Sequence, residues 1–138
     1  MRDLLAREDA GHGIEVDSAG TGDWHVGEPP DPRAATAARG RGVELTGLAR
    51  QVGDADFRDF DLLLAMDREN ARELVRRAPD ERAAARVRLL REYDPRAGGD
   101  LDVPDPYAGG EQGFEDVLDL VSAACQGLLQ DLRARRSR

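Results

Sequence analysis

Apolar residues recur at intervals of three and four positions near the end of the chain. They are Phe114, Val117, Leu118, Val121, Cys125, Leu128, Leu129 and Leu132. This spacing places one apolar stripe along a helix, so it predicts a long amphipathic final helix that begins after Gly113. Because Cys125 falls on that stripe, we expect its thiol to be buried and to pack as a small apolar side chain.

Three shorter stretches have the patterns of β-strands. Residues 61–66 form a nearly continuous apolar run, which is typical of a strand buried on both faces of a parallel sheet. Residues 13–17 alternate between apolar and polar positions, and residues 87–90 form a last short strand. The alternation of these strands with helical segments predicts a single α/β domain with a parallel sheet over residues 1–138.

The helical segments carry recognisable start and stop signals. We expect them at residues 1–8, 34–39, 54–60, 67–78 and 80–85. Asp31 followed by Pro32 indicates an N-cap and a first helical residue, and Asp67 is expected to cap the helix that follows the apolar run.

A long connection, residues 93–113, is rich in Asp, Pro and Gly, and loops of this length in small domains usually carry function. Within it Asp105 stands between Pro104 and Pro106. Pro106 disfavours helical geometry at Asp105, and Pro104 stiffens the approach. The spacing is compatible with an ordinary turn and with a carboxylate presented for chemistry, since Asp-Pro turns are common.

The loop at residues 18–27 consists mostly of small and polar residues and carries the single tryptophan of the chain, Trp24. A lone aromatic side chain in such a loop either covers the core or lies at the rim of a site, because functional residues concentrate on loops held by a rigid scaffold. The sequence leaves both interpretations open.

Composition excludes several classes of function. The chain has 138 residues, 40% hydrophobic and 35% charged, which is typical of one globular domain. Its net charge of −8 opposes nonspecific binding to nucleic acid, and we interpret the Arg-rich stretch 133–138 as a solvated helix end. No apolar run is long enough to span a membrane, so we expect a cytoplasmic protein with no membrane partner.

Candidate metal ligands and thiols are few. Cys125 is the only cysteine, so no intramolecular disulfide can form, and His12 and His25 lack partners at ligand spacing. We therefore expect no metal centre and no cofactor.

Several short motifs follow one another along the chain. They are Val16-Asp17-Ser18-Ala19-Gly20-Thr21, Trp24, Pro29-Pro30-Asp31-Pro32-Arg33, Ala49-Arg50-Gln51, Leu64-Ala65-Met66-Asp67 and Asp105-Pro106-Tyr107, with Phe114 downstream. In this order they resemble the low-molecular-weight protein-tyrosine-phosphatase family, and the resemblance extends over essentially the whole chain. It implies a three-layer α/β/α fold with a four-stranded parallel sheet. It also implies metal-free hydrolysis of phosphomonoesters, in phosphorylated proteins or small phosphoesters, through a phosphocysteine intermediate.

The resemblance assigns roles to individual residues. Asp105 matches the general acid that protonates the leaving oxygen and later activates water. Trp24 and Tyr107 match the aromatic walls of the substrate cleft, Ser18 matches a hydroxyl that braces the phosphate-binding loop, and Asp67 matches a structural helix cap.

The chain also departs from the family pattern. The family's nucleophile lies in a Cys-x5-Arg loop between its first strand and first helix, and this sequence contains no such motif. Ala108 stands where a second aromatic residue is usual, and Gly47 and Leu48 stand where a histidine is often found. We expect an N-terminally truncated phosphatase domain that lacks its central strand and is inactive as given, because loss of an essential catalytic group lowers rates by orders of magnitude.

Two other functions fit parts of the pattern. A noncatalytic module could bind a partner through the aromatic cleft around Trp24 and Tyr107. Arsenate reductase chemistry would need additional cysteines, which disfavours it here. The sequence leaves open whether the substrate carries phosphotyrosine, phosphoarginine or a small phosphoester, and it leaves the oligomeric state open.

Overall fold

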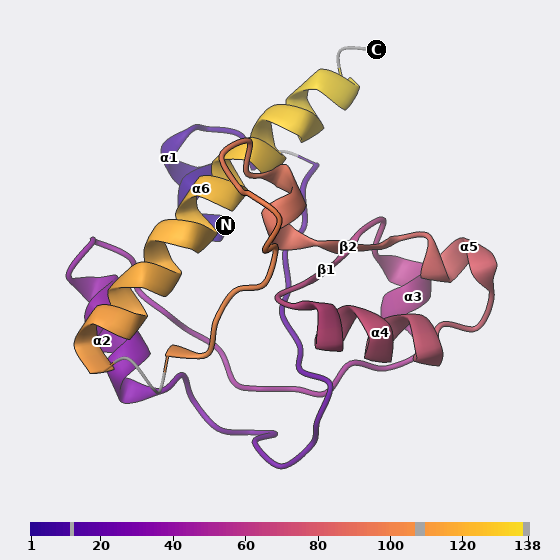
Figure 1. The fold of residues 1–138 in the computed structure, drawn as a ribbon, viewed down its shortest axis with the longest axis horizontal. Coiled ribbons are helices and arrows are strands. Elements are labelled where there is room, and N and C mark those ends of the chain that lie inside the picture. Colours follow the sequence, from indigo (N-terminus) through magenta and orange to yellow (C-terminus); the bar gives the residue numbers. More distant parts are fainter. Residues whose placement is uncertain (12, 107–109, 137–138) are drawn as a thin grey trace.

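The structure, a computed structural model, describes residues 1–11, 13–106 and 110–136. One long helix, α6 (Gly110–Arg136), runs along one side of the molecule (Figure 1). Its apolar stripe packs on α1 (Arg2–Arg7) and on the 3-10 turn η1 (Leu90–Tyr93). The buried residues of this core are Leu4, Leu5, Leu90, Ala124, Cys125, Leu128 and Leu129. The predicted burial of Cys125 is confirmed, with 6% of the residue exposed.

Helix α6 begins at Gly110, earlier than the apolar periodicity predicted. Its first turn is polar, and the side-chain Nε2 of Gln112 donates a 2.8 Å hydrogen bond to Oδ1 of Asp116. Glu111 in that turn also interacts favourably with the helix dipole. Gly113 faces the backbone of Pro106, and a Cβ atom at residue 113 would lie 2.6 Å from the Pro106 carbonyl oxygen. The start of α6 is therefore fixed by polar contacts and by a close backbone approach.

The sheet has two parallel strands, β1 (Leu63–Ala65) and β2 (Val87–Leu89), paired from Leu63–Val87 to Ala65–Leu89. Helices α4 (Arg68–Arg77) and α5 (Glu81–Ala84) form the crossover between them. The core on this side contains Phe57, Leu63, Ala65, Leu74 and Ala83. This arrangement confirms the predicted α/β class.

The remaining helices are α2 (Pro32–Arg39) and α3 (Asp56–Asp59). The side chain of Asp31 accepts hydrogen bonds from the first amides of α2, and Pro32 is the first helical residue, as predicted. The Asp67 side chain accepts the amide of Asn70, which confirms its role as the cap of α4.

The strand predicted at residues 13–17 does not form. Residues 14–19 have no regular secondary structure, and the carbonyl oxygen of Val16 accepts the Nε–H of Arg2 at 3.0 Å. The parallel pairing on this side occurs later, at an isolated bridge between Gly20 and Gln51. A strand needs a neighbouring backbone to complete its ladder, and the described residues form two paired strands where the sequence patterns predicted three.

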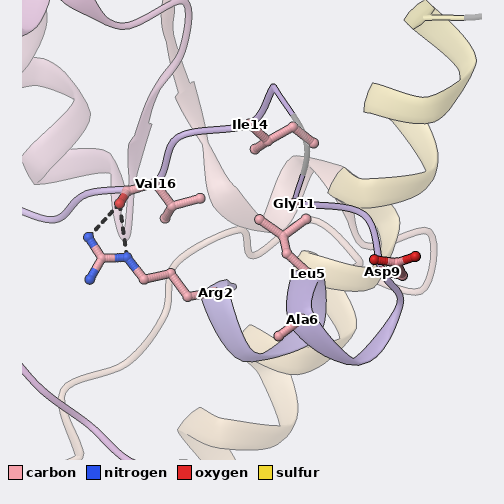
Figure 2. A pocket seen from close by; sticks show the side chains of 7 residues that line it. All are labelled: Arg2, Leu5, Ala6, Asp9, Gly11, Ile14 and Val16. Carbon is pink, nitrogen blue, oxygen red and sulfur yellow. Dashed lines mark hydrogen bonds between the residues drawn. The ribbon is translucent and has the colours of Figure 1, made fainter.

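A hollow of about 450 Å³ lies between α1 and the segment that follows it (Figure 2). Its lining residues are Arg2, Leu5, Ala6, Asp9, Gly11, Ile14 and Val16. Ile14 and Val16 are partly buried against the core. The alternation that predicted a strand therefore still marks which side chains of this segment face the core. None of the described helices is long and apolar enough to cross a membrane.

Candidate active site

The loop that carries Asp105 is anchored at the carboxyl end of β1. The amide of Val103 donates a 2.7 Å hydrogen bond to the carbonyl of Met66, the residue that follows the strand. The side-chain carboxylate of Asp102 accepts a 2.9 Å hydrogen bond from the backbone amide of Arg68. The backbone carbonyl of Asp102 accepts a 2.7 Å hydrogen bond from Nη1 of Arg91. Ligand sites in parallel α/β folds lie outside the carboxyl ends of the strands. This anchoring therefore places Asp105 at the edge where a site is expected.

The side chain of Asp105 is exposed. It follows the anchored residues Asp102 and Val103 directly along the chain, and Pro106 after it lies against the first turn of α6. The loop is thus held on both sides of the carboxylate. Tyr107, the second predicted cleft wall, lies outside the described residues, as does Ala108.

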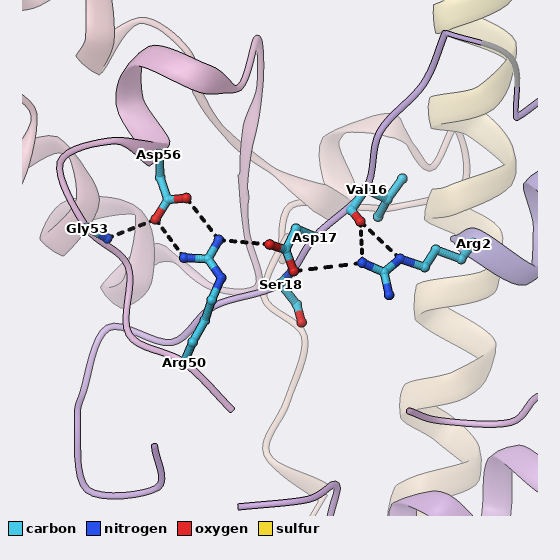
Figure 3. Close-up of polar contacts among 7 residues, drawn as sticks. All are labelled: Arg2, Val16, Asp17, Ser18, Arg50, Gly53 and Asp56. Atoms are coloured by element: carbon cyan, nitrogen blue, oxygen red, sulfur yellow. Dashed lines mark hydrogen bonds and ion pairs between the residues drawn. The ribbon is translucent and has the colours of Figure 1, made fainter. Parts of the chain in front are cut away.

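Ser18 lies in the irregular segment before the Gly20–Gln51 bridge, and it is exposed. Its amide donates a 2.8 Å hydrogen bond to Oδ1 of the neighbouring Asp17. Figure 3 shows Asp17 between Arg50 and Arg2. Two residues further on, the amide of Gly20 donates to the carbonyl of Arg50 at 2.9 Å. Ser18 is therefore fixed by contacts of the residues on either side of it.

Trp24 lies at the surface with 74% of the residue exposed, so the alternative that it covers the core is wrong. Its ring makes an edge-on contact with His25, with centroids 6.2 Å apart. The loop is held at its base, where the carbonyl of Thr21 accepts hydrogen bonds from Gln51 (3.2 Å) and from Arg77 of α4 (2.8 Å). An exposed aromatic ring on an anchored loop fits the rim of a site.

A network of ion pairs that the sequence patterns did not reveal lies behind Ser18. Arg50 donates from both terminal nitrogens to Asp56 at 3.0 and 2.9 Å, and its Nη2 is 3.3 Å from Asp17. The hydrogen bonds from Arg50 lower the pKa of Asp56, and Asp56 in turn raises the pKa of Arg50. The motif Ala49-Arg50-Gln51 flagged Arg50, but nothing in the spacing connected it to Asp17 or Asp56.

The structure thus distributes the predicted site residues over separate loops. Ser18 and Trp24 belong to the stretch between α1 and α2, while Asp105 belongs to the connection before α6. Cys125 lies in the core formed with α1 and η1, on the apolar stripe of α6, and this burial excludes it as a nucleophile for these loops. No group of three or more His, Cys, Asp or Glu residues suited to a metal ion occurs in the described part of the chain.

Known proteins are similar to this chain in sequence and in fold. The sequence profile of the low molecular weight phosphotyrosine protein phosphatase family matches residues 1–138. A low molecular weight protein-tyrosine-phosphatase of Streptomyces coelicolor is 54% identical over 129 residues, which cover 91% of this chain and 79% of the relative.

Solved structures agree with this match. A protein tyrosine phosphatase from Entamoeba histolytica superposes with a TM-score of 0.91 at 31% identity, covering 98% of this chain and 85% of the other. A Drosophila arginine phosphatase superposes with a TM-score of 0.86 at 30% identity, covering 95% and 84%. The chain belongs to the low molecular weight phosphotyrosine protein phosphatase family.

Proposed function

We propose that this chain provides the acid and the substrate cleft of a phosphomonoester hydrolase that acts on phosphorylated proteins. Asp105 is the general acid, Ser18 braces the phosphate-binding loop, and Trp24 with Tyr107 forms the aromatic walls. The observation that carries the proposal is the anchoring of the Asp105 loop to Met66 at the carboxyl end of β1. Family membership supports the reaction type.

The chemistry divides between Asp105 and a cysteine that this sequence does not hold. In the first step a thiolate attacks phosphorus, and Asp105 donates a proton to the departing oxygen. In the second step the Asp105 carboxylate takes a proton from the water that attacks the phosphocysteine. The sequence has no Cys-x5-Arg motif, since the residue six positions after Cys125 is Asp131. By this proposal the chain without such a loop is inactive.

A loop that carried this cysteine would lie beside residues 14–17. These residues have the alternation of a strand, yet they form no ladder within the described structure. A strand beside them would give this segment a neighbouring backbone to pair with, and it would deliver a Cys-x5-Arg loop close to Ser18.

Phosphotyrosine is the substrate that the site favours. The exposed ring of Trp24 offers a flat apolar surface, and aromatic rings pack on one another with a gain of about 0.5–1.5 kcal/mol beyond area burial. One of the similar structures is named an arginine phosphatase, so phosphoarginine is the competing substrate to include in the assay.

The test compares the chain with an extended protein, defined here as the chain preceded by a strand and a Cys-x5-Arg loop. The chain alone should release no phosphate from a phosphotyrosine peptide, while the extended protein should turn it over. Hydrolysis by the chain alone would contradict the proposal, and so would a folded extended protein without activity. Replacing the loop cysteine by serine in the extended protein is the matched control.

A noncatalytic binding module is the second candidate. Its supporting observation is that two paired loops carry exposed apolar side chains: Trp24 and Val26 on one loop and Leu48 on the other. The two loops are joined by 2.8 Å hydrogen bonds from Gly27 to Ala49 and from Ala49 to Glu28. Binding of an unphosphorylated peptide as tight as its phosphorylated form, measured by Trp24 fluorescence, would favour this function over the first.

We also propose a cytoplasmic location. Its support is the single cysteine of the sequence, which permits no intramolecular disulfide of the kind that stabilises many secreted domains.

A further inference from the structure

We propose that Arg50 is a positioning residue of the phosphatase site, which holds Ser18 in place through the carboxylate of Asp17. The inference rests on the proposed function, because Ser18 matters there through the hydroxyl that braces the phosphate-binding loop. It goes beyond that function by assigning the ion-pair network behind Ser18 to the site (Figure 3).

Asp56 is the fixed end of the network. It is buried, with 12% of its side chain exposed, and its Oδ2 also accepts the amide of Gly53 at 2.8 Å. Arg50 meets both carboxylate oxygens of Asp56 at 3.0 and 2.9 Å. A two-point contact between a planar guanidinium and a carboxylate fixes orientation as well as distance. Arg50 is thus held in one direction before any ligand arrives.

Asp17 is the link between Arg50 and Ser18. Nη2 of Arg50 lies 3.3 Å from Oδ2 of Asp17, while Oδ1 on the other side of the same carboxylate accepts the Ser18 amide at 2.8 Å. Arg2 of α1 lies 3.8 Å from Oδ1. The carboxylate is therefore contacted on both sides, and its orientation determines where the Ser18 backbone sits.

The backbone of Arg50 contacts the same segment from the other direction. Its carbonyl accepts the amide of Gly20 at 2.9 Å, and the amide of Val52 returns a 2.8 Å bond to the Gly20 carbonyl. Arg50 thus reaches the residue before Ser18 with its side chain and the second residue after it with its backbone. A displacement of about 1 Å at a positioning group can lower a rate about 100-fold, so such a clamp has catalytic value.

A purely structural role is the alternative, and Arg41 supplies the comparison. Arg41 also binds two carboxylates, those of Glu115 (Nη2 to Oε2, 2.5 Å) and Asp119 (Nη1 to Oδ1, 2.8 Å), where it joins α2 to α6. None of these three residues belongs to the Ser18, Trp24 or Asp105 loops. If Arg50 only stabilises the fold, Arg41→Gln and Arg50→Gln should change Ser18 exchange and kcat to the same extent. If Arg50 positions Ser18, only Arg50→Gln should change them.

The first measurement needs no activity and uses this chain without any extension. Hydrogen exchange of the Ser18 amide reports whether its bond to Asp17 is held. We expect Arg50→Gln to accelerate this exchange about tenfold or more, Arg50→Lys to have an intermediate effect because it cannot bind Asp56 at two points, and Arg41→Gln to leave it unchanged. Asp17→Asn keeps an acceptor for Ser18 but removes the charge that Arg50 binds, so it should also accelerate exchange even if Arg50→Gln fails to fold.

The second measurement uses the extended protein. Arg50→Gln should lower kcat about tenfold or more and change KM by less than about threefold, because an aligned group is lost while substrate contacts remain. The double variant with Asp17→Asn should be no slower than the slower single variant, since both residues act through one contact. Equal effects of Arg41→Gln and Arg50→Gln, or unchanged Ser18 exchange in Arg50→Gln, would overturn the inference. An inactive extended protein in which Ser18 exchange still responds to Arg50→Gln would contradict the proposed function and leave Arg50 as the group that positions Ser18.

Discussion

The ring of Trp24 lies so close to Gly22 that a methyl group at residue 22 would overlap ring carbons Cζ3 and Cη2. Glycine at this position is what allows the indole to fold back over its own loop while most of its surface stays in solvent. The orientation of the proposed cleft wall is therefore set by a neighbour two residues away.

Gly22→Ala should displace the Trp24 ring without unfolding the domain. The overlapping atoms belong to an exposed side chain that can rotate away, so we expect a change in the free energy of unfolding of less than about 1 kcal/mol. Because Trp24 is the only tryptophan, its fluorescence reports the movement directly. The emission maximum and acrylamide quenching should both change, and an unchanged spectrum would show that the ring does not depend on Gly22.

Gly127→Ala, unlike Gly22→Ala, should greatly lower the free energy of unfolding. A methyl group there would collide with the carbonyl oxygen of Tyr93, where α6 crosses η1, and backbone cannot rotate aside. Overpacking of this kind costs about 3 kcal/mol. The control is Gly99→Ala, because a methyl group at residue 99 would have open space around it. Chemical denaturation of both variants measures the difference between their free energies of unfolding. Equal midpoints for the two variants would contradict the close contact.

Acid should remove the contribution of Asp56 to stability. Its pKa in the folded chain lies below the usual value because of the hydrogen bonds from Arg50. The contribution is therefore complete above the unfolded pKa of about 3.9 and is lost as the pH falls through the lower folded value. Asp56→Asn should be less stable than the parent at pH 7, by about 1–3 kcal/mol, and this gap should narrow below about pH 4.

The control for this prediction is Asp54→Asn, which changes an exposed aspartate two residues earlier in the chain. At pH 7 the stability of Asp54→Asn should match that of the parent, because the carboxylate that it removes is exposed. A constant gap between the parent and Asp56→Asn from pH 7 to pH 3 would show that the ion pair with Arg50 does not titrate as described.

Local signals in the sequence predicted local structure well. The apolar stripe around Cys125 predicted the packing of α6, and the Asp31-Pro32 and Asp67 signals predicted the starts of α2 and α4, because caps and amphipathic faces depend on neighbours a few residues away. The prediction of a strand at residues 13–17 was wrong, because a strand depends on a partner that lies elsewhere in the chain.

The site was predictable only where a motif marked it. The frame Pro104-Asp105-Pro106 showed a stiff presented carboxylate, but its anchor on Met66 joins residues that are far apart in sequence. The motif Ala49-Arg50-Gln51 gave no role to Arg50. Its contacts with Asp17 and Asp56 could not be predicted, because they join three segments that meet only in the folded chain.

Proton donation by Asp105 is the central chemical claim for this protein. Its most direct test is the rate of leaving-group release in the first turnover of the extended protein, with and without Asp105→Asn. A tyrosine leaving oxygen needs a proton and a dinitrophenol leaving oxygen does not, so the variant should be slowed about 100-fold on a phosphotyrosine peptide and hardly at all on dinitrophenyl phosphate. Equal slowing on both substrates, or no slowing on the peptide, would contradict the assignment of Asp105 as the acid.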